Sequence, residues 1–437
     1  MSAQSNEPSI HPKRNTIGGV VGNVLEWYDF AVYGYFAPII GAQFFPTENK
    51  LAALISAFGV FAAGYMMRPL GGMIFGQIGD RIGRKRALQI SVLMMAIPTT
   101  LIGLLPTYAS VGIWASVGLV ALRLIQGVSV GGELIGSISF ITEIAPRKRR
   151  GYYGSWTMVS AIAGVLLGSL MATVMTNMLD AATMSAWGWR LPFLVGILIG
   201  GFGLWMRKGM AESPDFEKIE STGEVSQSPV TEALRQHPAQ IIHVGSMVMC
   251  LGGGFYMLFV WWPTYLNTIV DPPIAHSLLV NTISMVALSA LIPFAGALSD
   301  RLGRKRVLIA SHLAMVVVAW PLFYITDYSA VLAALACQLV FAFLMSGIEG
   351  PMPAAMVEMF PTKTRFSGVA IGYNVSLAVF GGTSPLVCTW LISATGDIAA
   401  PAYYLIAMAF IGFVAATRLQ VAHGEELASS SLRKSSR

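Results

Sequence analysis

Long apolar runs, each about as long as a membrane-crossing helix, follow one another along almost the whole chain, separated by short segments rich in charge, proline or glycine. A helix needs about 20 apolar residues to cross the hydrocarbon core of a bilayer. The runs are too long and too uniformly apolar for the alternating strands of a membrane barrel. We therefore predict an all-α membrane protein of about twelve transmembrane helices. Their predicted bounds are 17–40, 51–78, 87–106, 113–142, 152–176, 190–206, 241–268, 278–298, 307–326, 330–357, 366–392 and 402–418.

Composition and the placement of charge agree with a membrane protein. Of the 437 residues, 55% are hydrophobic and 11% are charged, against roughly 25% charged residues in soluble domains. Lys and Arg gather in alternate loops, and such loops face the cytoplasm. We therefore predict an inner-membrane protein with both termini in the cytoplasm. Its net charge of +6 then reflects topology and contact with anionic membrane lipid, not binding of nucleic acid.

The chain shows no sign of a cleaved signal peptide, a metal site or an enzyme active site. Glu26 and Asp29 interrupt the first apolar run and no small-residue cleavage site follows, so we expect this run to remain as a helix. The three cysteines lie singly in apolar runs and the six histidines are scattered, which predicts no disulfide, metal or other cofactor. No nucleophile or base constellation is visible, so we predict that the protein is not an enzyme.

A loop motif occurs twice. Gly79–Arg86 (GDRIGRKR) follows the second predicted helix, and Ser299–Arg306 (SDRLGRKR) follows the eighth. A second pair, Glu143–Gly151 and Glu358–Gly368, closes the fourth and the tenth predicted helices in the same way. Because each pair lies on one side of the membrane, the repeats indicate two six-helix units duplicated in parallel.

The segment between the two units is the longest polar one and is rich in Glu, Ser, Pro and Lys. It has too little apolar surface to fold alone, so we interpret it as a linker. The predicted organisation is a cytoplasmic N-terminus at 1–16, an N-terminal six-helix bundle at 17–207, a cytoplasmic linker at 208–240, a C-terminal six-helix bundle at 241–418 and a cytoplasmic tail at 419–437.

The repeated loop resembles the signature of the major facilitator superfamily. Other segments make the chain similar to the metabolite:proton symporter family, whose members import proline and betaine, oxoglutarate, citrate or shikimate. The resemblance covers nearly the whole chain and implies a major facilitator fold of twelve helices in two parallel six-helix repeats. The segments that carry it are Gly22–Phe30, Arg68–Gly72, Arg123–Gly127, Gly131–Glu133 and Trp187–Phe193.

Two departures from related families affect the predicted function. Drug exporters of the superfamily usually carry a proline in the fifth helix, which Ala161–Gly168 lacks. The tail is also too short for the coiled coil found in many osmosensing proline/betaine importers. The missing proline disfavours export, so we favour import and keep a drug or metabolite exporter working as a proton antiporter as the alternative.

Acidic residues inside the first predicted helix are candidates for proton coupling. Gly22, Glu26, Asp29 and Tyr33 form one helical stripe. Two neighbouring carboxylates repel when both are ionised, so one of them is suited to carry a proton. The alternative is that they orient a neighbouring Arg. Glu133 on the fourth helix is a further candidate for the proton.

Arg123 lies on a shared face of the fourth predicted helix with Gln126 and Glu133. Its guanidinium suits a carboxylate, which belongs either to the substrate or to Glu26 or Asp29. An Arg that alternates between substrate and acid would couple the two ligands. A permanent structural ion pair is the other interpretation.

Glu349 in the tenth predicted helix is flanked by glycines and prolines that weaken the helix at mid-membrane depth, a common place for ligands. With the aromatic residues of the seventh helix it suits a cationic nitrogen, although Trp261 and Trp262 also fit an interfacial belt. The predicted substrate-binding residues are Arg123, Tyr33, Gln126, Tyr256, Trp261, Glu349, Tyr373 and Asn374.

The charges of the two repeated loops are predicted to form clusters between the halves that control the conformational equilibrium. Arg68 is grouped with them as a helix-end anchor, with substrate contact as the alternative. The predicted gating residues are Arg68, Asp80, Arg81, Arg84, Asp300, Arg301 and Arg304.

These features predict a proton-coupled symporter that imports a small carboxylate-bearing metabolite by alternating access. A zwitterionic osmolyte such as proline or betaine and an organic acid such as citrate or oxoglutarate both fit the candidate residues. The expected partners are the metabolite, a proton and membrane lipid, and we expect a monomer to be functional.

Overall fold

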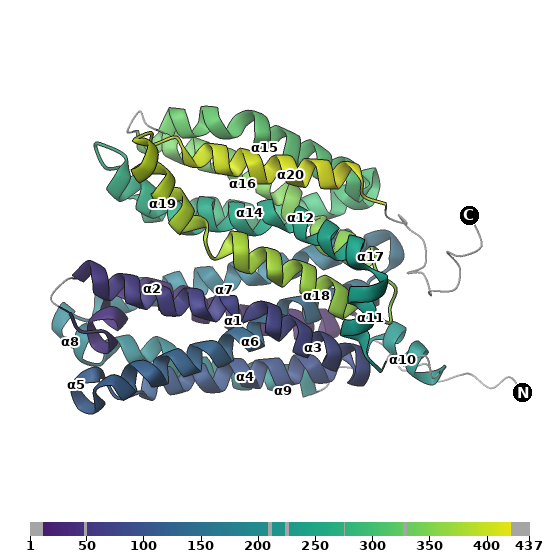
Figure 1. Ribbon diagram of the computed structural model, residues 1–437, viewed down its shortest axis with the longest axis horizontal. Helices are drawn as coiled ribbons and strands as arrows, with labels where there is room; N and C mark the ends of the chain where they lie inside the picture. Colours follow the sequence, from purple (N-terminus) through teal and green to yellow (C-terminus); the bar gives the residue numbers. More distant parts are fainter. Residues whose placement is uncertain are drawn as a thin grey trace, which may run out of the picture.

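The computed structural model describes residues 12–47, 50–208, 212–222, 227–274, 276–326 and 330–420. Within these ranges the regular structure is helical throughout. Figure 1 shows the long helices side by side along one axis, with α1 beginning and α20 ending at the same end of the molecule. A chain that crosses the membrane an even number of times ends on the side where it began. This arrangement agrees with the predicted twelve crossings.

The first half of the chain supplies the lower group of helices in Figure 1. The long elements are α1 (Pro12–Phe44), α2 (Lys50–Met66), α3 (Arg68–Ile82), α4 (Arg84–Leu104), α6 (Ile113–Ile144), α7 (Arg150–Met178) and α9 (Leu191–Lys208). Short elements connect them: α5 (Tyr108–Val111), η1 (Arg147–Arg149), α8 (Ala181–Ala186) and η2 (Gly188–Arg190). The linker contributes α10 (Pro214–Ser221) and α11 (Pro229–Gln236).

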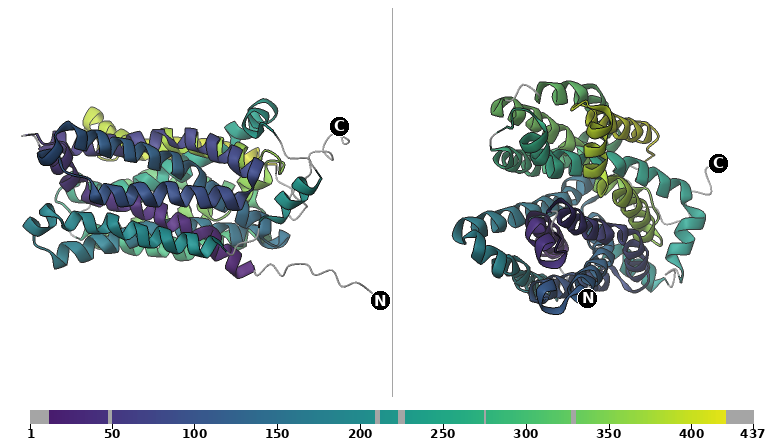
Figure 2. Two further views of the ribbon diagram at one scale, coloured as in Figure 1. Left: turned by 90° about the horizontal axis from the view of Figure 1, so that it is seen from below. Right: turned by 60° about the vertical axis from the view of Figure 1, so that its left-hand side comes forward.

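The second half supplies the upper group. Its seventh crossing comprises α12 (Pro238–Phe255), η3 (Tyr256–Trp261), α13 (Trp262–Thr264) and η4 (Tyr265–Ile269). The eighth crossing is α14 (Ser277–Leu302) and the ninth is α15 (Arg304–Thr326). The tenth comprises α16 (Val331–Glu349) and α17 (Met352–Glu358). The eleventh comprises α18 (Arg365–Ser376), η5 (Leu377–Gly381) and α19 (Ser384–Thr395), and the twelfth is α20 (Pro401–Thr417). Viewed more nearly along the helices, the two groups remain distinct (Figure 2, right).

The predicted helices match these elements. Nine helical spans in the described ranges are long and apolar enough by themselves to cross a membrane. The other three crossings are α1, the α2–α3 pair and α20. The prediction of an all-α fold with twelve transmembrane helices is confirmed. Helix limits differ by a few residues; for example, α12 begins at Pro238.

Several crossings are interrupted near their middle. The tenth is broken between Glu349 and Met352, as its Gly and Pro residues predicted. The π-helical segments η3 in the seventh crossing and η5 in the eleventh were not predicted. Such segments displace side chains from the regular helical faces and often occur at functional sites.

The repeated loops adopt the same backbone conformation. Gly83 has φ of 106° and Gly303 has φ of 94°, and each ends one helix and begins the next. Residues with a side chain rarely adopt positive φ, which explains glycine at both positions. We call the end of the molecule that holds these two loops the motif end.

Two seams join the halves. On one seam α7 packs against α14, and on the other α3 packs against α18. A Cβ on Gly296 would lie 2.5 Å from the carbonyl oxygen of Gly151, so the α7–α14 seam has no room for a larger residue there. The halves therefore touch through small residues, as helices in membranes commonly do.

Candidate functional site

A small cavity lies between the two halves. It has a volume of about 20 Å³, enough for about one water molecule. Trp27 of α1 and three residues of α7 line it from the first half, and α12, η3, α16, α18 and η5 line it from the second. The lining residues are Trp27, Met158, Ala161, Ile162, Leu251, Gly252, Phe255, Tyr256, Glu349, Tyr373 and Leu377.

Glu349 is the charged residue in this lining, and it sits where α16 ends. Its side chain is 3% exposed. Within the described residues, Oε1 of Glu349 has no hydrogen-bond partner. A buried carboxyl oxygen without a partner is costly and calls for an explanation. A cationic ligand in the cavity would supply one.

A second group of buried charges adjoins the cavity. Arg68 at the start of α3 lies 3.6 Å from Glu26, measured between Nη2 and Oε1. Its Nε donates to Oδ1 of Asn374 at 3.3 Å, across the two halves. Among the described residues, both carboxylate oxygens of Glu26 and both terminal nitrogens of Arg68 lack hydrogen-bond partners. Tyr373, in the cavity wall, lies within electrostatic range of Glu26, Arg68 and Glu349.

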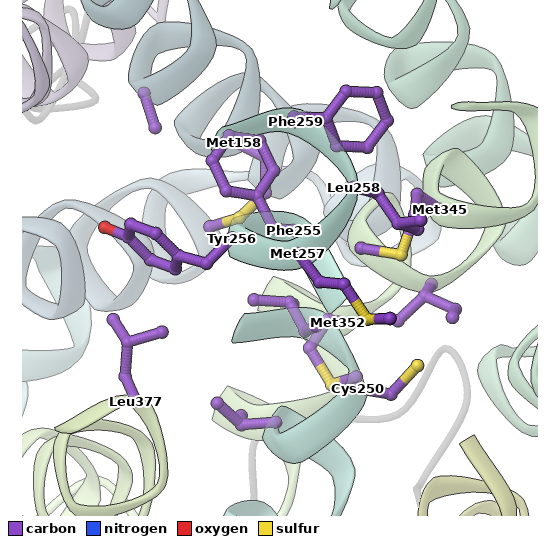
Figure 3. Packing of buried hydrophobic residues seen from close by; sticks show 14 of the residues in the cluster. Met158, Cys250, Phe255, Tyr256, Met257, Leu258, Phe259, Met345, Met352 and Leu377 are labelled. Carbon is purple, nitrogen blue, oxygen red and sulfur yellow. The ribbon is translucent and has the colours of Figure 1, made fainter. Parts of the chain in front are cut away.

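Aromatic rings join the two charged groups. The hydroxyls of Tyr65 and Tyr256 are hydrogen-bonded between the halves, and the guanidinium of Arg68 lies 5.2 Å from the Tyr65 ring centroid. Trp27 packs on Phe255 and Tyr256, with centroids 5.9 and 6.3 Å away. Figure 3 shows Tyr256 pointing to the opposite side of its helix from Met257, Leu258 and Met345. One face of the seventh crossing therefore lines the cavity and the other packs in the core.

Arg123 occupies a different cluster inside the first half. Its Nη1 contacts Oδ2 of Asp29 at 2.5 Å, and its guanidinium lies 3.8 Å from the Tyr33 ring centroid. Gln126 donates to Oδ1 of Asp29 at 3.0 Å, and the Tyr33 hydroxyl donates to the carbonyl of Ala57 at 3.0 Å. Asp29 is thus fully engaged, whereas Glu26 is not.

Glu133 and Trp261 also have partners away from the cavity. Glu133 is paired with Arg207 of α9 and accepts a hydrogen bond from Ser91. Trp261 donates Nε1 to the hydroxyl of Thr389 on α19 at 3.0 Å. Neither residue lines the cavity in this conformation.

The motif end is closed at the α3–α18 seam. Asp80 accepts hydrogen bonds from the backbone N–H and hydroxyl of Ser367, at 3.0 and 2.8 Å, and pairs with Arg84 at 3.1 Å. Arg365 of the second half reaches Glu143 of the first half at 2.8 Å. An acid of the loop thus caps the start of α18, where helix N–H groups favour negative charge.

The second copy of the loop closes the α7–α14 seam in the same way. Asp300 accepts hydrogen bonds from the N–H groups of Gly151 and Tyr152 at the start of α7, at 2.9 and 2.8 Å. It also pairs with Arg304 at 2.7 Å, which reaches Glu358 at 3.2 Å. The sequence repeat is therefore a repeat of contacts between the halves.

The structure separates the predicted gating residues into groups. Arg68 lies 12 residues before Asp80 on α3, about 18 Å along the helix, and it contacts the central charges instead of the loops. Arg81 is exposed and donates to Gln227 of the linker at 3.3 Å. Arg301 is exposed beside Asp300. No group of acids, histidines or cysteines able to hold a metal occurs in the described part of the chain.

Comparison with known proteins identifies the family. The sugar (and other) transporter model matches residues 16–248, and the major facilitator superfamily model matches residues 271–434. A protein of Staphylococcus haemolyticus (strain JCSC1435) named putative proline/betaine transporter is 35% identical over 94% of this chain and 88% of its own length. The chain belongs to the major facilitator superfamily. It is a multi-pass membrane transporter, and the predicted resemblance is confirmed.

A further relative and a solved structure extend the comparison. The glycine betaine/proline/ectoine/pipecolic acid transporter OusA of Dickeya dadantii (strain 3937) is 33% identical over 90% of this chain and 80% of its own length. The proton:xylose symporter XylE bound to 6-bromo-6-deoxy-D-glucose has a TM-score of 0.81 at 18% identity, over 95% of this chain and 98% of XylE. The structural likeness shows that this transporter has the major facilitator fold.

Some residues at the cavity were not predicted from the sequence. Trp27 belongs to Gly22–Phe30, a segment that carries the family resemblance. It was not predicted as a site residue because it follows Glu26 directly and so lies off the helical stripe of Glu26. Tyr65 is three residues before Arg68, a spacing that puts two side chains on one face of the predicted helix 51–78. That spacing would have suggested the ring as a partner of the guanidinium.

Replacement of Asp80 tests whether the loops control conformation. We expect Asp80→Asn to slow transport because it removes the charge that caps α18, while substrate affinity changes by less than about tenfold, or 1.4 kcal/mol. Asp180→Asn is the matched control, since Asp180 is exposed and caps α8. Initial uptake rates and equilibrium binding check both variants. Unchanged turnover in Asp80→Asn would argue against gating.

Proposed function

We propose that this transporter is a proton-coupled symporter that imports small zwitterions with a cationic nitrogen and a carboxylate, such as proline or betaine. The observation that carries the proposal is the cavity between the halves, which places the buried Glu349 among aromatic rings; its Oε1 has no hydrogen-bond partner among the described residues. The cavity also adjoins Arg68, whose two terminal nitrogens lack hydrogen-bond partners among the same residues. The names of the relatives support the same class, since betaine, proline, ectoine and pipecolic acid all combine these two charges.

The cationic end of the substrate binds beside Glu349. Trp27, Phe255, Tyr256 and Tyr373 surround this part of the cavity. Aromatic faces attract cations, and desolvated contacts of this kind contribute about 2 kcal/mol. A quaternary ammonium, which has no N–H to donate, would be held by these faces and by the charge of Glu349.

The carboxylate end binds Arg68. Its two terminal nitrogens lack hydrogen-bond partners among the described residues, and a guanidinium fork suits a carboxylate. Arg123 was expected in this role, but its contact with Asp29 makes it the weaker candidate. Asn374 holds Nε of Arg68 and so orients the fork.

We assign the coupled proton to Glu26. In its charged form Glu26 holds Arg68, although at 3.6 Å and without hydrogen bonds. Protonation of Glu26 releases Arg68 for the substrate carboxylate, which couples the two ligands. Asp29 remains the second candidate because it shares the helical stripe with Glu26, and Glu133 and Glu349 follow.

Transport proceeds by alternating access. Residues of both halves line the cavity, so rocking of the halves widens it from one-water size to substrate size. The Asp80 and Asp300 contacts break when the motif end opens. Their strength sets the population of the two states.

We further propose the membrane arrangement that the basic loops indicate. The protein lies in the inner membrane, and its motif end and both termini face the cytoplasm. The two bundles are 17–207 and 241–418, joined by the linker 208–240, and a single chain completes the cavity, so a monomer is functional. The predicted tail 419–437 lies almost entirely outside the described residues.

Uptake by the purified protein tests the proposal. Proteoliposomes with an imposed inward proton gradient should accumulate radiolabelled betaine or proline, and a proton-conducting ionophore should abolish the accumulation. Citrate and oxoglutarate serve as comparison substrates. Accumulation of these acids without betaine or proline would replace the zwitterion by an organic acid. Gradient-driven exclusion of added drugs, with no uptake, would favour the proton antiporter.

A further inference from the structure

The two seams between the halves differ in what covers them at the motif end. On the α3–α18 seam the linker helix α11 packs on both α3 and α18. Nearby, Glu212 of the linker accepts hydrogen bonds from the N–H groups of Arg84 and Lys85, at 3.0 and 3.2 Å. The linker therefore contacts one of the two places where the halves separate.

Exposed basic side chains flank, along the chain, the residues that close the other seam. Lys148 and Arg149 of η1 are exposed on the first half, and Arg301 and Lys305 are exposed on the second. We call these four residues the seam patch. The element η1 packs on α14, and the bonds from Gly151 and Tyr152 to Asp300 hold the two loops together. Asp300 is itself paired with Arg304, so the seam patch keeps its positive charge.

Aromatic and apolar side chains continue from the seam patch into the region of the membrane. Tyr152 packs against Tyr153 and Trp156, with centroids 5.4 and 6.2 Å away. Trp156 is 39% exposed on α7, and Leu298 and Phe294 are exposed on α14. Trp and Tyr favour the headgroup level of a bilayer, and exposed Leu and Phe face acyl chains. The seam patch therefore lies at the height of lipid headgroups.

We propose that the seam patch binds the phosphate of an anionic phospholipid, whose acyl chains lie along Leu298 and Phe294. Juxtamembrane cations attract anionic lipid by about 1 kcal/mol each. Since each half supplies two of the four cations, the lipid binds best when the halves touch. It stabilises the closed motif end at the seam opposite the linker helix α11, which makes transport dependent on lipid charge.

Lipid binding to the purified full-length protein tests this inference. Native mass spectrometry in neutral detergent would count retained phosphatidylglycerol during a titration. The double variant Lys148→Gln/Arg149→Gln should bind it about thirtyfold more weakly, the effect of two cations at about 1 kcal/mol each. Arg301→Gln/Lys305→Gln should weaken binding similarly, because the site bridges the halves.

The controls separate this site from general attraction to anions. Arg235→Gln/Arg418→Gln removes the same charge from exposed positions on α11 and after α20, and should leave binding unchanged. Equal loss in that control, or equal binding of phosphatidylcholine, would overturn the proposal. Displacement of the lipid by millimolar inorganic phosphate would instead identify a site for soluble anions. An effect of only one seam-patch pair would refute bridging between the halves. These outcomes do not depend on the transported substrate.

Discussion

Betaine binding is expected to fall about thirtyfold or more in Glu349→Gln. The substitution keeps the size of the side chain but removes the charge that faces the substrate nitrogen. Removing one partner of a buried charge pair costs at least ~2 kcal/mol, which corresponds to this loss of affinity. Glu349 lines the cavity without a hydrogen bond to Oε1 in the described residues, so its charge is available to a ligand. Equilibrium binding of radiolabelled betaine at fixed pH measures the change.

Glu358→Gln is the matched control for this prediction. Glu358 lies on α17, nine residues further along the chain, and pairs with Arg304 at the motif end at 3.2 Å. Its replacement should alter the rate of transport more than the affinity for betaine. Wild-type affinity in Glu349→Gln would remove Glu349 from the site. Equal losses of affinity in both variants would indicate a general structural effect.

Glu26→Gln is expected to abolish accumulation driven by a pH gradient while counterflow exchange continues. A neutral residue mimics the protonated acid, so Arg68 stays free for substrate but no proton is carried. At a tenfold proton gradient, symport of one proton supports about tenfold accumulation, or 1.4 kcal/mol, and the variant should reach only equilibration. Gradient-driven uptake and counterflow in proteoliposomes measure the two properties separately.

Asp29→Asn provides the comparison for Glu26→Gln. Asp29 is held by Arg123 and Gln126, so its loss should impair packing of the first half more than coupling. Loss of both accumulation and counterflow is therefore expected at Asp29. If both single variants still accumulate substrate against a gradient, the proton is carried elsewhere, with Glu133 and Glu349 as the next candidates.

The twelve-helix fold could be predicted because lipid allows few alternatives. Apolar runs of sufficient length must form helices, and the repeated loops revealed the parallel duplication. The break beside Glu349 was also predicted, since glycine and proline weaken a helix locally. These features depend on short stretches of sequence, which is why one sequence was enough to predict them.

The partners of the buried charges could not be predicted in the same way. Arg68 and Arg123 are both buried in membrane-crossing segments, and the sequence favoured Arg123 as the substrate contact. Which arginine approaches the cavity depends on how α3 and α6 are rotated against the second half. That rotation results from packing of distant residues, such as the contact of Arg68 with Asn374, 306 positions away.

Side-chain directions on the seventh crossing limited the prediction of the cavity wall as well. Tyr256 and Trp261 were both assigned to the substrate from their place in the seventh crossing. Both belong to η3, but residues five apart already lie about 140° apart around a regular α-helix, so the two side chains belong to different faces. As a result Tyr256 lines the cavity, whereas Trp261 bonds to Thr389.

Electrogenicity tests proton–zwitterion symport most directly, because it needs no mutation. A zwitterion carried with one proton moves one positive charge inward, whereas a monoanion carried with one proton moves none. A potential of 100 mV acts on one charge with ~2.3 kcal/mol, which gives roughly fiftyfold additional accumulation. An inside-negative potassium diffusion potential should therefore drive betaine or proline uptake into proteoliposomes at equal pH. Uptake that does not rise with the potential would contradict zwitterion symport and would favour electroneutral transport of a carboxylate with a proton.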